Sequence, residues 1–103
     1  MPLDLKAVLG QIDSVIVQCK QLKSRTQYED YSDLPDEDIA EVVNLLFATI
    51  NRLAPPGSAY VRNAQVFEKY LSGNIGIAMN PLIGLIRALR ADYEAGNLQS
   101  VVE

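Results

Sequence analysis

The most conspicuous group of side chains that could do chemistry is a run of carboxylates. Seven of the 13 Asp and Glu residues lie between positions 29 and 41, and no Lys or Arg occurs between Arg25 and Arg52. Clustered oxygens suit Ca²⁺, but the spacing lacks the turn glycine and the terminal glutamate of an EF-hand loop. We therefore expect a solvated acidic segment, with a basic protein partner as the alternative and Asp36, Glu37 and Asp38 as its candidate contacts.

Other catalytic chemistry finds few suitable residues. The chain has no histidine, which removes the most frequent general base, the usual catalytic triads and most transition-metal sites. Cys19 falls within an apolar helical stripe, where a small buried hydrophobic side chain is expected rather than a nucleophile. The glycines form no phosphate-binding motif. The sequence therefore predicts no catalytic residue, no metal and no cofactor, and hence a protein that is not an enzyme.

Basic residues offer a second candidate surface. Arg87 and Arg90 are three apart on one expected helix, and Arg62 and Lys69 lie on another. If these faces adjoin, they form a basic patch that would suit an accessory nucleic-acid- or nucleotide-binding subunit. The simpler interpretation is a solvated surface with helix ion pairs such as Arg90 with Glu94. A net charge of −4 repels phosphates on average, so we do not expect nucleic acid as a partner.

Tyrosine supplies all the amphipathic aromatic side chains, since the chain has five tyrosines and no tryptophan. Tyr28 and Tyr31 lie in a segment without apolar periodicity, and we expect them to anchor that loop. Tyr70 falls away from the face that Tyr60 and Phe67 share. It is therefore predicted to be exposed and to contact a partner.

The element that must organise these groups is a helix that includes Ile39–Leu53. Its apolar residues recur at spacings of four and three and spread over most of its circumference, which is typical of a central helix with several neighbours. Its start is expected near Leu34–Asp36, where Pro35 and three carboxylates suit a first helical turn. The Pro-Pro-Gly sequence after Ala54 ends it.

The first helix is expected over Leu3–Lys23. Its apolar residues repeat every seven positions over three heptads; they are Leu5, Ile12 and Cys19, Val8, Val15 and Leu22, and Leu9 and Ile16. Such a stripe could pack inside a bundle or pair with a second chain. Because the central helix needs more cover than two small neighbours give, we predict a homodimer at micromolar concentration.

Two further helices follow. One is expected over Ala59–Leu71, with Ser58 as its N-cap and Gly73 as a left-handed C-terminal cap. An apolar linker, Ile75–Met79, should lie against the bundle. The other helix is expected over Pro81–Ala95.

The start of this fourth helix has its own signals. Asn80 is the expected N-cap, with Pro81 in the first helical position. Leu82, Ile86, Leu89 and Tyr93 share one face, and Gly96 ends the helix.

These elements predict an all-α, four-helix bundle-like domain over residues 1–103, mostly antiparallel. Leu98, Val101 and Val102 have the spacing of a short fifth helix. No segment reaches the ~20 apolar residues that span a bilayer, and the first residues do not resemble a secretory signal. We expect a cytoplasmic protein without membrane contacts.

The sequences RLAPPGSAYVRNA and IRALRADYEAGNLQSVVE, within Leu53–Glu103, resemble the front portion of bacterial proteins, cyanobacterial ones included. In those, the DYEAG segment leads into a helical domain similar to the HEPN or abortive-infection type. A HEPN ribonuclease signature needs a histidine that this chain lacks, so no catalytic residue is transferred. The resemblance implies a non-catalytic interaction or assembly module, and we interpret the chain as the N-terminal part of a longer protein.

Overall fold

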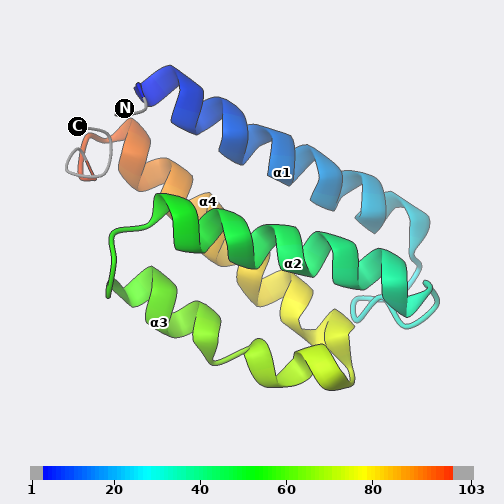
Figure 1. Ribbon diagram of the computed structural model, residues 1–103. Coiled ribbons are helices and arrows are strands. Elements are labelled where there is room, and N and C mark those ends of the chain that lie inside the picture. The colour runs from blue at the N-terminus through cyan, green and yellow to red at the C-terminus, as the bar shows by residue number, and fades with distance from the viewer. Residues whose placement is uncertain (1–3, 99–103) are drawn as a thin grey trace.

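The computed structural model describes residues 4–98, and within that range every regular element is a helix. The elements are the α-helices α1 (Leu5–Arg25), α2 (Asp36–Leu53), α3 (Ala59–Gln65) and α4 (Met79–Glu94), with the 3₁₀-helices η1 (Glu68–Ser72) and η2 (Ile75–Ala78) between α3 and α4 (Figure 1). The predicted all-α bundle is confirmed. The fifth helix predicted from Leu98 onward lies almost wholly outside the described residues.

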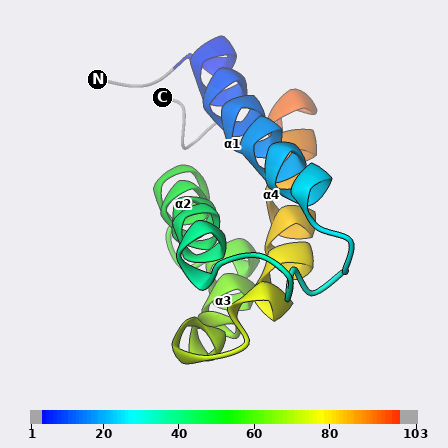
Figure 2. The ribbon, with the colours of Figure 1, turned by 90° about the vertical axis from the view of Figure 1, so that its right-hand side faces the viewer.

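The helices form a bundle in which each α-helix runs opposite to the α-helix before it, so α1 is antiparallel to α2 and α4, whereas α2 and α4 run the same way (Figure 1). Helices α1, α2 and α4 all contact one another, and α3 packs against α2 and α4. Consequently α1 and α3 occupy opposite edges of the molecule, with α2 and α4 between them (Figures 1 and 2). No helix within residues 4–98 is long and apolar enough to cross a membrane.

Helix α2 is the centre of the core, as its sequence predicts. Ile39, Val43, Leu46, Ile50 and Leu53 are 0–2% exposed. The helix contacts α1, α3, α4 and η2, so its wide apolar face is covered from several directions. It begins at Asp36, with Pro35 in the capping position just before it.

Helix α1 buries most of its heptad stripe inside this bundle. Val8, Ile12, Val15, Cys19 and Leu22 are at most 4% exposed, whereas Leu5 at the N-terminal end is 42% exposed. The helix begins two residues later than predicted. Asp4 caps it, because its carboxylate accepts a hydrogen bond of 2.7 Å from the Ala7 amide.

The predicted inner face of α4 is confirmed, since Leu82, Ile86, Leu89 and Tyr93 are 0–1% exposed. The predicted start and N-cap are wrong. Helix α4 begins at Met79 directly after η2, so Asn80 lies inside it and donates its side-chain amide to the Glu29 carbonyl over 3.3 Å. Pro81 is still within the first turn, where a backbone N–H has no helical partner to lose.

The single helix predicted over Ala59–Leu71 is also wrong. The chain leaves the α-helix after Gln65 and continues as the 3₁₀-helix η1, which leaves Leu71 40% exposed. Gly73 has an extended backbone, and the left-handed residue is Asn74, with φ 45°. Asparagine tolerates this region better than most residues, which explains how the turn forms one position later than predicted.

The apolar linker after this turn lies against the bundle, as predicted. Ile75, Gly76, Ala78 and Met79 are buried, and the linker forms the short 3₁₀-helix η2 before α4 begins. Its burial brings η2 beside the loop between α1 and α2.

Candidate functional site

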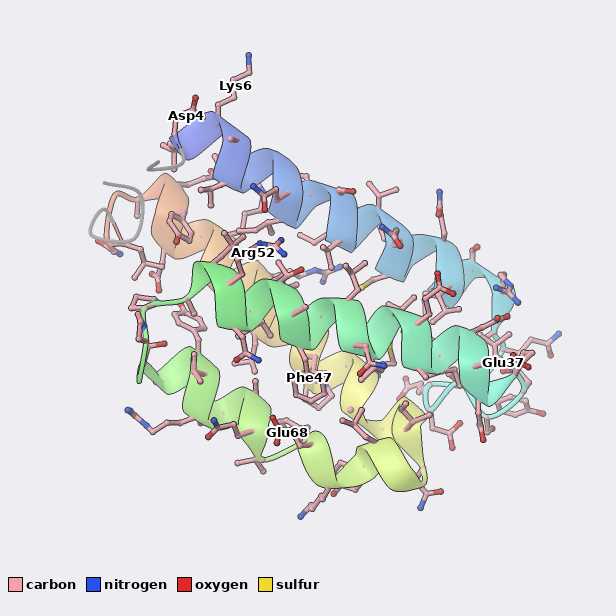
Figure 3. All side chains as sticks on the ribbon, in the orientation of Figure 1. Asp4, Lys6, Glu37, Phe47, Arg52 and Glu68 are labelled. Atoms are coloured by element: carbon pink, nitrogen blue, oxygen red, sulfur yellow. The ribbon has the colours of Figure 1, made fainter. Side chains whose placement is uncertain are left out.

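The predicted acidic contacts lie at one end of the bundle, where α2 begins. Asp38 is partly buried and forms an ion pair of 2.7 Å with Arg25 at the end of α1. Asp36 and Glu37 are exposed, and within residues 4–98 neither lies within 4 Å of a Lys or Arg nitrogen. The three carboxylates therefore divide into one that holds the α1–α2 corner together and two that face solvent (Glu37 in Figure 3).

The fold brings a second, apolar group to these two carboxylates. Leu71 and Ile77, which are 40% and 44% exposed, flank the η1–η2 turn. Two hollows of about 320 and 210 Å³ lie between that turn and the start of α2. They adjoin, because both are lined by Asp36, Asn74 and Ile75. We call this surface the acidic end and define it by Asp30, Asp36, Glu37, Leu71 and Ile77.

Close backbone packing fixes the geometry of the acidic end. A Cβ atom on Gly76 would lie 1.8 Å from the Asp30 carbonyl oxygen, so only glycine lets η2 approach the loop this closely. The Asp30 side chain accepts a 3.1 Å hydrogen bond from the Ser32 amide. A few residues along the loop, the hydrogen bonds from Thr26 and the Gln27 amide lower the pKa of the Asp33 carboxyl.

The chemistry of the acidic end is that of a binding surface. No Lys or Arg lines either hollow, so cations of a partner would meet carboxylates without a competing charge. Within the described residues, no three His, Cys, Asp or Glu side chains are arranged to hold a metal ion. The acidic end can therefore bind a partner that carries both positive charges and apolar side chains.

The four basic residues grouped by the sequence do not share one face. Arg90 reaches α1, where its guanidinium donates two hydrogen bonds, of 2.6 and 3.2 Å, to Asp13 and lowers the pKa of that carboxyl. Arg90 also pairs with Glu94, as predicted. Arg62 donates to the Gly57 carbonyl, on the α3 side of the molecule.

The remaining two cations of that group are also separated. The Lys69 ammonium lies 5.3 Å from the centroid of the Tyr70 ring, on η1. Arg87 instead lines a pocket with residues of α1. Because α1 and η1 lie on opposite sides of the bundle, the predicted basic patch is not assembled (Figure 2).

The tyrosine predictions are partly wrong. Tyr70 is half-buried and stacks on Phe67 with 6.3 Å between ring centroids, because the 3₁₀ geometry of η1 turns it towards the bundle. Tyr31 is fully buried and anchors its loop, as predicted. Tyr28 is 57% exposed, so its side chain does not anchor the loop in the core.

Cys19 is a buried hydrophobic residue, as predicted. It is 2% exposed, and burial raises the pKa of its thiol to about 11. At neutral pH the thiolate is therefore scarce, which is the opposite of what a nucleophilic cysteine needs.

Sequence reasoning missed the residues from the η1–η2 turn. Nothing in the local pattern places Leu71 or Asn74 beside Asp36, because that contact depends on where the 3₁₀ turns begin. One signal was present, since a glycine within an apolar run such as Ile75-Gly76-Ile77 often marks a close backbone approach. Comparison of the chain with protein-family models, curated proteins and solved structures finds no match. The resemblance to HEPN-type proteins therefore stays a prediction.

Proposed function

We propose that the protein is a non-catalytic helical interaction module whose acidic end docks a basic, partly apolar segment of another protein. The observation that supports this proposal is the juxtaposition of exposed Leu71 and Ile77 with three carboxylates around two adjoining hollows. Apolar contacts would supply affinity, and the carboxylates would select a cationic partner and set its orientation.

Charge argues for a different protein as this partner rather than a second copy. In a symmetric dimer the same patch meets itself. Two acidic ends would then place carboxylates against carboxylates, which is unfavourable. A segment with Lys or Arg on both sides of one or two apolar residues matches the surface instead.

The homodimer predicted from the first helix stays a prediction. Much of the stripe that suggested it is buried within the monomer, and the large apolar residues of α1 that stay exposed are Leu5 and Val17. Sedimentation velocity distinguishes a monomer of 11.4 kDa from a dimer of twice that mass. A Val17→Asp variant should dissociate a dimer that uses this face of α1.

The docking proposal is tested with a short synthetic peptide of mixed Lys and Leu residues, labelled for fluorescence anisotropy. The Glu37→Gln variant should weaken binding about 2–5-fold, as expected for one exposed ion pair. The double variant Leu71→Ser, Ile77→Ser should weaken it further, because it removes the apolar contacts.

Glu68→Gln is the matched control, since it removes an identical exposed charge outside the acidic end (Figure 3). Its affinity for the peptide should equal that of the wild type. Equal losses in Glu68→Gln and Glu37→Gln would show unspecific attraction to an acidic protein. That result, or unchanged affinity in the serine double variant, would contradict the proposal.

A further inference from the structure

A pocket of about 190 Å³ between α1 and α4 carries the opposite charge to the acidic end. Its rim contains three cations, Lys20 and Lys23 from α1 and Arg87 from α4. Its walls include Ile16 and Ile83. We call it the α1–α4 pocket. The chain as a whole has a net charge of −4, so the three cations make this pocket locally positive on an acidic protein.

Arg87 differs from the other arginines in its partners. Arg25 pairs with Asp38, Arg90 with Asp13, and the Arg52 and Arg62 guanidinium groups donate to the Gln11 side chain and the Gly57 carbonyl. Among residues 4–98, Arg87 is the one arginine that makes no such bond. Within the same range, neither Arg87 nor the two lysines lies within 4 Å of a carboxylate oxygen. No ion pair within residues 4–98 therefore neutralises these three charges.

The floor of the pocket is held in a strained conformation. Tyr31 is fully buried and has a positive φ of 60°, which is uncommon for a bulky residue. The Lys23 ammonium lies 5.1 Å from the centroid of its ring. The loop is fixed from outside by Gly76 against Asp30 and by Asn80 on the Glu29 carbonyl. Such strain persists where surrounding structure fixes it, and it is concentrated at binding sites.

The charge of the pocket selects the class of ligand. We propose that the α1–α4 pocket binds a small phosphomonoester, with Arg87 and the two lysines around the phosphate and the organic part against Ile16 and Ile83. A phosphomonoester carries about −1.5 to −2 charges at pH 7, which three cations balance better than they balance a single carboxylate. The guanidinium fork of an arginine also matches phosphate geometry.

The size of the pocket and the overall charge of the protein favour a small molecule over a polymer. A volume of about 190 Å³ holds one phosphate and a few carbons, whereas pockets for larger ligands exceed about 300 Å³. A nucleic acid would extend over surface whose mean charge repels its backbone. The occupant is therefore a compact ester rather than a strand.

The proposal is tested by titrating the labelled protein with phenyl phosphate, inorganic phosphate and benzoate while recording backbone amide NMR shifts. Phenyl phosphate should bind most tightly, and its shifts should be centred on Lys20, Lys23, Tyr31 and Arg87. Inorganic phosphate should bind the same residues more weakly, because it lacks the apolar part. Benzoate should bind weakest of the three if charge selects the ligand.

Variants then separate a specific site from general attraction. Arg87→Gln should weaken phenyl phosphate binding about tenfold or more, as for the loss of a hydrogen bond between charged groups. Lys20→Gln should weaken it by a smaller factor, and it is the second variant if Arg87→Gln alters the fold. Lys6→Gln is the matched control, because Lys6 is exposed on the same helix at its far end (Figure 3).

Three outcomes would overturn the inference. The first is shifts that spread over the surface or centre elsewhere. The second is an equal loss of affinity in Lys6→Gln and Lys20→Gln. The third is benzoate binding as tightly as phenyl phosphate, which would show an anion site without preference for phosphate. The Glu37→Gln variant should bind phenyl phosphate like the wild type, so this test is independent of the peptide test at the acidic end.

Discussion

The three long helices and the segment between α2 and α4 are held in the structure by different means. Helices α1, α2 and α4 have 21, 18 and 16 residues, and each buries a continuous apolar stripe. In the short segment, α3 has seven residues and buries Ala64, while η2 buries Ile75, Gly76 and Ala78. A helix of seven residues is not stable alone. The long helices therefore define the core, and the short segment takes its shape from contacts with them.

This difference also separates the two proposed sites. The cations of the α1–α4 pocket all lie on regular helices, whereas the acidic end combines the first turn of α2 with a loop, two 3₁₀-helices and the left-handed residue Asn74. Paired substitutions, one in a long helix and one in the short segment or its loop, test whether the two regions differ in this way.

The largest effect is expected in the central helix. Leu46→Ala or Ile50→Ala should lower the free energy of unfolding by about 2–5 kcal/mol, because both side chains are 0% exposed. Leu71→Ala in η1 should cost about 1 kcal/mol or less, because its side chain is 40% exposed. Urea unfolding measures all three. A loss below about 1 kcal/mol at both Leu46 and Ile50 would contradict their assignment to the core.

Two glycines give the next comparison. Gly76→Ala should destabilise by about 1–3 kcal/mol, because the new Cβ meets the Asp30 carbonyl oxygen and backbone must move. Gly84→Ala in α4 meets nothing within 4 Å and should stabilise by about 0.5–1 kcal/mol through helix propensity. Thermal and urea unfolding report both signs. Equal effects at the two positions would remove the evidence that η2 packs tightly on the loop.

The third comparison is between the residues that precede two helices, Asp4 before α1 and Ser58 before α3. Asp4→Ala should cost about 0.5–2 kcal/mol, since the Asp4 carboxylate accepts from the Ala7 amide. Ser58 stands at the start of α3, but its buried hydroxyl has no hydrogen-bond partner among the described residues. Ser58→Ala should therefore cost nothing measurable. A loss at Ser58 as large as that at Asp4 would show that α3 is capped like a long helix.

The last comparison depends on pH and concerns Tyr60, which joins α3 to α4 by donating its hydroxyl to Asp92. Burial, followed by the bond to Asp92 and its charge, raises the pKa of Tyr60 from 10.0 to about 12. A raised pKa contributes stability that is complete below pH 10 and is lost as the pH rises towards 12. The wild type should therefore lose stability across that window.

Phenylalanine variants isolate this contribution. Tyr60→Phe should lack part of the alkaline loss, because it has no hydroxyl to ionise there. Tyr28→Phe, which changes an exposed tyrosine, should follow the wild type. The measurement is the urea midpoint as a function of pH. If the urea midpoints of Tyr60→Phe and the wild type fell in parallel with pH, ionisation of Tyr60 would not be the cause of the alkaline loss.

Sequence reasoning succeeded where an apolar period ran over several turns. The faces of α1, α2 and α4 repeat at three and four residues, and burial of those faces is sufficient to fix both the type and the packing side of each helix. It failed at Gly73, Asn80 and Tyr70. Each lies in or beside a 3₁₀ turn, where one residue of displacement changes which side chain caps and which faces solvent.

The candidate sites were harder to predict because they depend on contacts between distant residues. Asp36, Glu37 and Arg87 were identified from charge alone, but the partners that give them a pocket were not. Lys20 and Lys23 lie near the C-terminal end of a helix, where cations are common because they favour the helix dipole, so their charge alone indicates no site. Only the packing of α1 on α4 shows that they share a hollow with Arg87.

Asp30 and Tyr31 are consecutive residues, yet Asp30 belongs to the acidic end and Tyr31 to the floor of the α1–α4 pocket. One peptide unit, about 3.8 Å long, separates the two surfaces. A ligand that shifted this unit from one side would alter the shape offered to a ligand on the other. Thermodynamic reciprocity then requires that a phosphomonoester change peptide affinity by the same factor as the peptide changes phosphomonoester affinity.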